Sequence, residues 1–133
     1  DPELDYANAK SEKENWELRF PQAGNIVSGL KVLDKVDNIE SISASMDNYY
    51  IYNNIRECPM SYFGKGRYAN LNENKRCEEL AKEIKISGKI SPLIVAIDKE
   101  GPYILEGGHR LQALQILGVK SFPALVVLDK END

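Results

Sequence analysis

The sequence is poor in the residues that build metal sites, disulfide frameworks and membrane spans. Its 133 residues include two cysteines, one histidine and one tryptophan. Cys58 and Cys77 form no CxxC pair and have no histidine at ligand spacing, which argues against a zinc site. We expect two free thiols in a reducing compartment, and therefore a cytoplasmic protein. Apolar runs such as Ala124–Leu128 are far too short to span a membrane, so we expect no membrane partner.

Basic charge is also scarce. The chain has 17 Lys and Arg against 21 Asp and Glu, which gives a formal net charge of −4. This balance argues against a passive nucleic-acid coat, because phosphate binding needs concentrated Lys and Arg. One local basic stretch remains, and it contains Lys65, Arg67, Lys75 and Arg76.

The length and the 42% hydrophobic content suit one compact domain with a real core. The chain begins at Asp1 without a methionine, so we expect a trimmed protein or an excised domain.

The first third of the chain has helical features. Ser11 and Glu14 form a capping-box pattern at the start of SEKENWELRF. Apolar residues recur at helical spacing over 26–33 and again over 39–46. We therefore predict an N-terminal helical extension over residues 1–48, followed by a separate domain over 49–133.

The pattern changes after residue 48. Residues 49–63 are rich in Tyr and Ile and predict extended structure that is broken at Pro59. The Gly- and Asn-rich stretch 64–76 is typical of a loop. A helix is predicted over 74–88, with Asn74 as its cap and Gly88 at its end.

The last third alternates strands and a helix. SPLIVAID is a nearly continuous apolar run and predicts a strand buried on both faces. PYILEG predicts a second strand that forms a hairpin with the first. A helix over 108–118, with leucines facing inward, and a strand over 122–129 follow. Strand, helix, hairpin, helix and strand make a compact α+β unit.

The motif EGGHR, residues 106–110, lies where a strand ends and a helix begins. The first helical turn has N–H groups without internal partners and partial positive charge. Gly107 and Gly108 let a ligand approach the backbone, Arg110 adds a fork of donors, and His109 adds a titratable ring. These features together predict an anion site, although no P-loop motif is present. The alternative is a surface turn in which Arg110 pairs with Glu106.

The order and spacing of these segments resemble the ParB/sulfiredoxin-like superfamily over residues 54–129. The resemblance rests on CPMSYF, the helix CEELAKEIKISG, the proline-led strand ISPLIVA, the signature YILEGGHR and the strand FPALVV. It implies the ParB/sulfiredoxin-like fold, a compact mixed sheet with helices. The signature is most similar to that of the free serine kinases, DGHHR.

Members of this superfamily bind nucleotides or nucleic acids. The resemblance implies that Gly107, His109 and Arg110 hold phosphate, with the backbone of Gly108 beside them. Glu106 matches an acidic position, where a carboxylate can hold Mg²⁺ or accept a proton. Glu106 and His109 are therefore the implied catalytic residues, and ATP or another nucleotide with Mg²⁺ the implied cofactors.

Two residues outside the signature are further candidates for nucleotide binding. Arg67 lies where ParB-like proteins often place a basic residue that faces the phosphates. Ser91 precedes Pro92 at the entry to a strand that approaches the nucleotide. The alternatives are a solvated loop arginine and a simple strand-entry serine. Glu78 and Glu79 are expected on a solvated helix face.

Gly108 departs from the pattern of the superfamily. Sulfiredoxins have their reactive cysteine at this position, ParB proteins an acidic residue and the serine kinases a histidine. Sulfinic-acid reduction is not expected, because neither Cys58 nor Cys77 lies in the signature. A ParB-type CTP switch is not expected either, because no helix-turn-helix segment follows before Asp133.

Three functions stay open. We favour nucleotide binding, with phosphotransfer or nucleotide hydrolysis at the EGGHR corner. The second is a ParB-like DNA-binding or nuclease domain that contacts the DNA backbone through the basic stretch from Lys65 to Arg76. The third is a catalytically silent recognition module of a larger phage or toxin protein. With each of these functions, the protein could form a homodimer.

Overall fold

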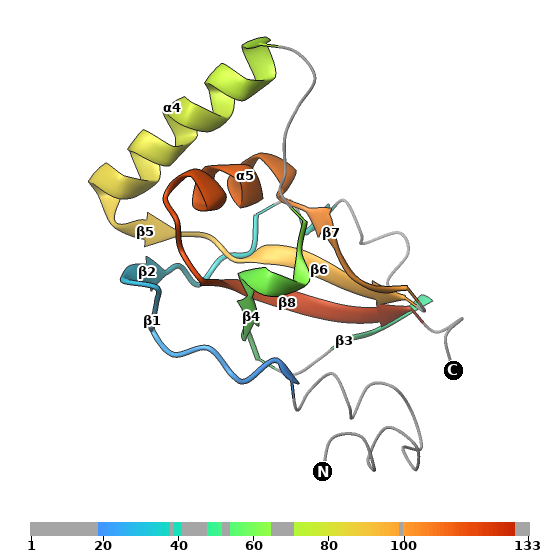
Figure 1. Ribbon diagram of the computed structural model, residues 1–133. Coiled ribbons are helices and arrows are strands. Elements are labelled where there is room, and N and C mark those ends of the chain that lie inside the picture. Colours follow the sequence, from blue (N-terminus) through green and yellow to red (C-terminus); the bar gives the residue numbers. More distant parts are fainter. Residues whose placement is uncertain are drawn as a thin grey trace.

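The computed structural model describes residues 19–37, 39–40, 48–51, 54–64, 71–98 and 100–129 (Figure 1). The elements bounded within these ranges are β1 (Ile26–Val27), β2 (Leu30–Val32), β3 (Tyr49–Ile51), β4 (Arg56–Pro59), the 3-10 helix η2 (Met60–Tyr62), α4 (Leu71–Ser87), β5 (Lys89–Ile90), β6 (Leu93–Asp98), β7 (Gly101–Glu106), α5 (Gly108–Ile116) and β8 (Ser121–Asp129). Mixed strands and helices confirm the predicted α+β class.

The larger sheet is organised around β8. Its strand order is β3-β8-β6-β7, and β4 pairs with β8 as well. One edge of β8 pairs in parallel with β6, and its other edge pairs antiparallel with β4 and then with β3. The predicted β6–β7 hairpin is confirmed, since the two strands pair antiparallel.

A second, smaller sheet corrects the prediction for the start of the chain. Residues 26–33 were predicted to be helical, but β1 and β2 form an antiparallel hairpin, and β2 pairs in parallel with β5. Ser28 and Gly29 at the turn have φ of 52° and 79°. Two positive φ angles suit a tight hairpin turn, and the β-branched residues around it favour strands over the helix that the apolar spacing suggested.

The described part of the predicted N-terminal extension also packs on the main core. Phe20 is fully buried, and its ring meets that of Tyr62 edge to face, with the centroids 5.3 Å apart. Phe20 belongs to the same hydrophobic cluster as Val95 and Ile97 of β6. The domain boundary at residue 48 stays a prediction. The helices predicted over 11–20 and 39–46 lie largely outside the described residues.

The other predicted elements are confirmed, with one correction to α4. The chain is extended in β3 and β4, and β4 ends at Pro59 as expected. Helix α4 ends before Gly88, whose N–H donates to the carbonyl of Ile84. It begins at Leu71, however, so residues 71–76, predicted to belong to a loop, are helical, and Asn74 lies inside the helix and does not cap it. The side chain of Asn74 instead accepts a hydrogen bond from Gln112 of α5.

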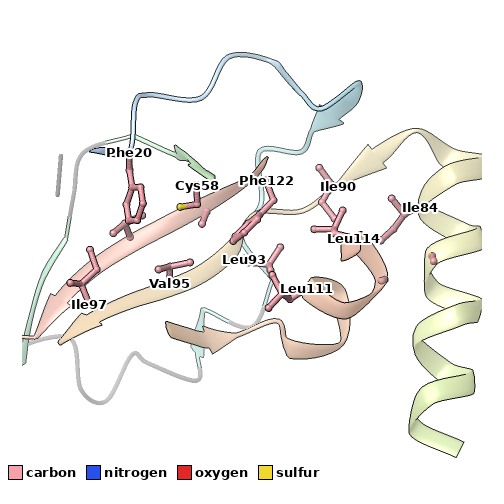
Figure 2. Packing of buried hydrophobic residues seen from close by; sticks show 14 of the residues in the cluster. Phe20, Cys58, Ile84, Ile90, Leu93, Val95, Ile97, Leu111, Leu114 and Phe122 are labelled. Atoms are coloured by element: carbon pink, nitrogen blue, oxygen red, sulfur yellow. The ribbon is translucent and has the colours of Figure 1, made fainter. Parts of the chain in front are cut away.

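The core fills the space between the larger sheet and the helices (Figure 2). As predicted, β6 is buried on both faces: Leu93, Val95 and Ile97 face the helices, and Ile94 and Ala96 join a cluster on the other face. The helical side of the core is closed by Ile84 of α4 and by Leu111 and Leu114 of α5 (Figure 2).

Both cysteines are free and fully buried, as the sequence predicted for the thiols. Cys58 packs in the main hydrophobic cluster. Burial raises the pKa of the Cys58 thiol far above its ordinary value, and burial also raises the pKa of Cys77. Neither side chain is therefore suited to thiolate chemistry.

The junction between β7 and α5 needs a glycine at one position. Gly107 precedes α5 with φ of 111° and ψ of 27°. A Cβ atom on this residue would lie 2.8 Å from Cγ of Leu93 and 3.1 Å from Nη2 of Arg110. Backbone conformation and space therefore both exclude a larger residue, and they fix the point at which α5 begins.

We predict that Gly107→Ala costs about 3 kcal/mol of the free energy of unfolding, because it adds a collision with a buried leucine to an unfavourable φ. Gly118→Ala is the matched control, since Gly118 also has a positive φ of 74° but nothing lies near its missing Cβ. The control should lose only about 1 kcal/mol. Urea denaturation followed by circular dichroism measures both, and equal losses would contradict the packing argument.

Candidate functional site

A cavity of about 390 Å³ lies between α4 and the β7–α5 junction. Helix α4 contributes Arg76, Glu79, Leu80 and Glu83, and the junction contributes the whole predicted signature, residues 106–110. Five candidates from the sequence, Glu106 to Arg110, are thus brought together around one space. The cavity is bordered by carboxylates as well as by cationic groups.

The contribution of α4 was not predicted. Arg76, Glu79 and Glu83 follow helical spacing and so lie on one face of α4. Glu79 is exposed, as expected, but it borders the cavity, whereas Glu78 is not among the residues that line it. Only the packing of α4 on α5 identifies this face as part of the site, because the sequence pattern gives no sign of which exposed face meets the signature.

The first turn of α5 borders the cavity with its backbone. The N–H of Leu111 donates to the carbonyl of Gly107 over 2.8 Å, which is the first hydrogen bond of the helix. The preceding N–H groups of a helix have no intrahelical acceptor, and the helix dipole adds partial positive charge there. This end of the cavity is therefore suited to an anion.

Arg110 is held firmly at one side of the cavity. Its Nη1 donates to the carbonyls of Ser91 and Pro92, over 2.8 and 3.0 Å. Its Nη2 is buried and has no hydrogen-bond partner among the described residues. Burial lowers the pKa of Arg110, and the charges of Asp37 and Glu106 oppose that shift. The guanidinium remains cationic, as arginine does in proteins.

The two candidates outside the signature have different outcomes. Ser91 lines a neighbouring groove of about 370 Å³, not the cavity beside the signature. The groove and the cavity share Leu80, Glu83 and Arg110. Ser91 contacts Arg110 through its backbone carbonyl. Arg67 lies outside the described residues, so its predicted contact with phosphate stays a prediction.

His109 is joined to α4 by its side chain. Its Nε2 forms a hydrogen bond with Oε2 of Glu73, and each side chain is about one-third exposed. One turn further along α5, Nε2 of Gln112 donates to Oδ1 of Asn74 over 3.1 Å. Neither Glu73 nor Asn74 was predicted to contribute to the site, because both contacts depend on how α4 packs against α5.

The cavity contains carboxylates but no preformed metal centre. Among the described residues, no group of three or more His, Cys, Asp or Glu side chains is placed to hold a metal ion. Mg²⁺ in nucleotide sites commonly uses one or two carboxylates together with phosphate oxygens and water. Glu106 as a magnesium ligand therefore stays a prediction. Within the same part of the chain, no helix is long and apolar enough to cross a membrane.

A match to a family model identifies the family of this chain. Residues 37–133 match the model of the ParB N-terminal domain. The chromosome-partitioning protein ParB of Myxococcus xanthus strain DK1622 is 31% identical over 71 residues, which are 53% of this chain and 21% of that protein. The chain therefore spans about a fifth of the length of this relative. Sulfiredoxin from Arabidopsis thaliana has a similar crystal structure over 54% of this chain and 82% of its own, with 26% identity and a TM-score of 0.42.

The family match includes every described element that borders the cavity, which are α4, the end of β7 and the start of α5. It confirms the resemblance that the order of motifs and the signature had indicated. The chain belongs to the ParB N-terminal domain family, within the ParB/sulfiredoxin-like superfamily.

Proposed function

We propose that this domain binds the phosphates of a nucleotide in the cavity between α4 and the start of α5. One observation supports the proposal most directly: the cavity joins a helix N-terminus that begins with two glycines to the side chains of Arg76 and Arg110. Backbone N–H groups and guanidinium groups are the donors that phosphate oxygens prefer.

The two arginines have different roles in this proposal. Arg76 is exposed on α4, so its guanidinium can move to meet a phosphate. Arg110 is fixed by two carbonyls, and its Nη2 is a buried donor without a partner among the described residues. An unsatisfied charged donor is costly, and a shift of the Arg110 side chain that let Nη2 reach a phosphate oxygen would offset that cost.

The carboxylates suggest how a reaction would proceed. Glu79, Glu83 and Glu106 border the same cavity and would repel bare phosphates. Glu106 would help to hold Mg²⁺, and the bound ion would supply charge neutralisation and polarisation of the phosphoryl group. The domain would then mainly position the phosphates, with Glu106 as the base that accepts a proton from the attacking group.

We predict that Arg76→Ala weakens nucleotide binding about tenfold, because it removes one charge-assisted contact from a mostly exposed site. Lys85→Ala is the matched control, since Lys85 is an exposed cation of α4 that does not border the cavity. Calorimetric titration with ATP and CTP, each with Mg²⁺, measures both variants. Absence of binding to the unmodified protein, or equal losses in the two variants, would contradict the proposal.

We predict that Glu106→Gln lowers the rate of phosphate release from the bound nucleotide about a hundredfold, because an amide cannot accept the proton. Affinity for the nucleotide measured without Mg²⁺ should be retained. His109→Gln should not lower the rate in the same way, because the histidine ring is not the base. A colorimetric assay of released phosphate tests this. A rate that Glu106→Gln leaves unchanged would contradict the role of Glu106 as the base. Nucleotide binding without any turnover would instead favour the silent recognition module.

DNA is a second candidate ligand, favoured by the name of the chromosome-partitioning relative. Lys75 and Arg76 on α4 are the described part of the predicted basic stretch. If they contact DNA phosphates, affinity for a labelled duplex should fall steeply as the salt concentration rises. The double variant Lys75→Ala/Arg76→Ala should reduce the slope of log affinity against log salt concentration by about two. Fluorescence anisotropy measures this, and cleavage of the duplex with Mg²⁺ would add nuclease activity. Affinity that does not depend on salt would count against DNA binding.

A further inference from the structure

We propose that His109 is a positioning residue, and that Glu73 and Asn74 act with it to hold Arg76 at the cavity. The polar contacts His109–Glu73 and Gln112–Asn74 join the first turns of α4 to α5. This inference rests on the proposed function, because it concerns how the phosphate site is held together.

The spacing of the four residues makes the two contacts a single connection. His109 and Gln112 are three residues apart and so lie on the same face of α5. Glu73 and Asn74 are adjacent in the first turn of α4. Two contacts side by side fix both the position and the rotation of a helix, whereas a single contact leaves the rotation open.

The first turns of α4 take little part in the main hydrophobic cluster, although Cys77 is fully buried. The residues of α4 in the main hydrophobic cluster, Leu80, Ala81 and Ile84, lie in the second half of the helix. The four residues 73–76 are all polar. Gln112 is 92% buried, so its contact with Asn74 is shielded from water and holds its geometry. The placement of residues 73–76 therefore depends on these polar contacts together with the burial of Cys77.

Arg76 links this connection to the site. Arg76 is three residues after Glu73, on a neighbouring part of the helix surface. Arg76 and His109 border the cavity, whereas Glu73 and Asn74 do not. Because Nε2 of His109 is bonded to Glu73, the ring connects two helices, and its effect on a phosphate passes through α4.

A double-mutant cycle between Glu73 and Arg76 tests this role in the full chain. The probes are inorganic phosphate and ATP with Mg²⁺, measured by calorimetric titration. Glu73→Ala should weaken binding about tenfold in the unmodified protein, but by less than about twofold when Arg76→Ala is already present. Equal losses in the two backgrounds would overturn the proposal, because Glu73 would then act independently of Arg76.

A second cycle separates positioning from direct contact. If His109 acts through Glu73, the double variant Glu73→Ala/His109→Ala should bind no more weakly than either single variant. If His109 itself contacts phosphate, the losses should multiply to about a hundredfold, which would contradict the proposal. If the unmodified protein binds neither probe, the proposed function itself is contradicted. That outcome differs from the failure of this inference, in which the protein binds but the cycles do not show coupling.

Three controls exclude effects of charge and of folding. Glu78→Ala removes an exposed carboxylate of the same helix that does not border the cavity, and should leave affinity unchanged. Glu73→Gln keeps a hydrogen-bond partner for the ring and should retain affinity within about threefold of the unmodified protein. Thermal unfolding by circular dichroism confirms that each variant is folded.

The contact itself can be observed without any ligand. His109 is the only histidine of the chain, so its ring nitrogens give an unambiguous NMR signal. Glu73→Ala should shift the Nε2 resonance, and Glu78→Ala should leave it in place. An Nε2 resonance that does not respond to Glu73→Ala would overturn the proposed connection, whatever the binding data show.

Discussion

The close packing of Gly107 against Leu93 is the constraint on which the site depends. Leu93 is fully buried at the start of β6, and the missing side chain of Gly107 lets the end of β7 lie directly beside it. Helix α5 can therefore begin at the level where β6 enters the sheet. Arg110 strengthens the same junction from the other side, since it donates to the carbonyls of Ser91 and Pro92 just before β6. Strand, glycine and helix are thus held as one rigid corner.

The charges around this corner explain why it is suited to selective binding more than to strong binding. Two guanidinium groups and a helix N-terminus attract anions, while the carboxylates of Glu79, Glu83 and Glu106 oppose them. A free anion would gain little in such a balanced field. A ligand that arrives with its own cation, or that places its negative charge only at the helix end, would gain more.

Sequence patterns predicted the second half of the fold because local and tertiary preferences agree there. Each pattern there indicates a single structure. The continuous apolar run indicates the buried strand β6, the inward leucines indicate the helix α5, and the glycine indicates the end of α4. Residues 26–33 were misread because their apolar spacing also fits a helix, and only the turn at Ser28 and Gly29 decides between the two. The signature could be recognised in the sequence. Arg76 was noted only as part of a basic stretch and Glu73 not at all, since their places beside the signature depend on the packing of α4 against α5.

The central strand of the larger sheet lies at the end of the described chain, and this has a consequence for synthesis. β8 is the shared pairing partner of β3, β4 and β6, which all precede it. On the ribosome, the larger sheet cannot close until residues 121–129 have emerged. Until then, the backbone N–H and C=O groups that pair with β8 in the earlier strands have no partner. Folding of the larger sheet is therefore coupled to the completion of its last strand. A nascent chain that stalls before residue 121 therefore lacks the complete sheet behind the β7–α5 junction, even though the whole EGGHR signature has already been translated.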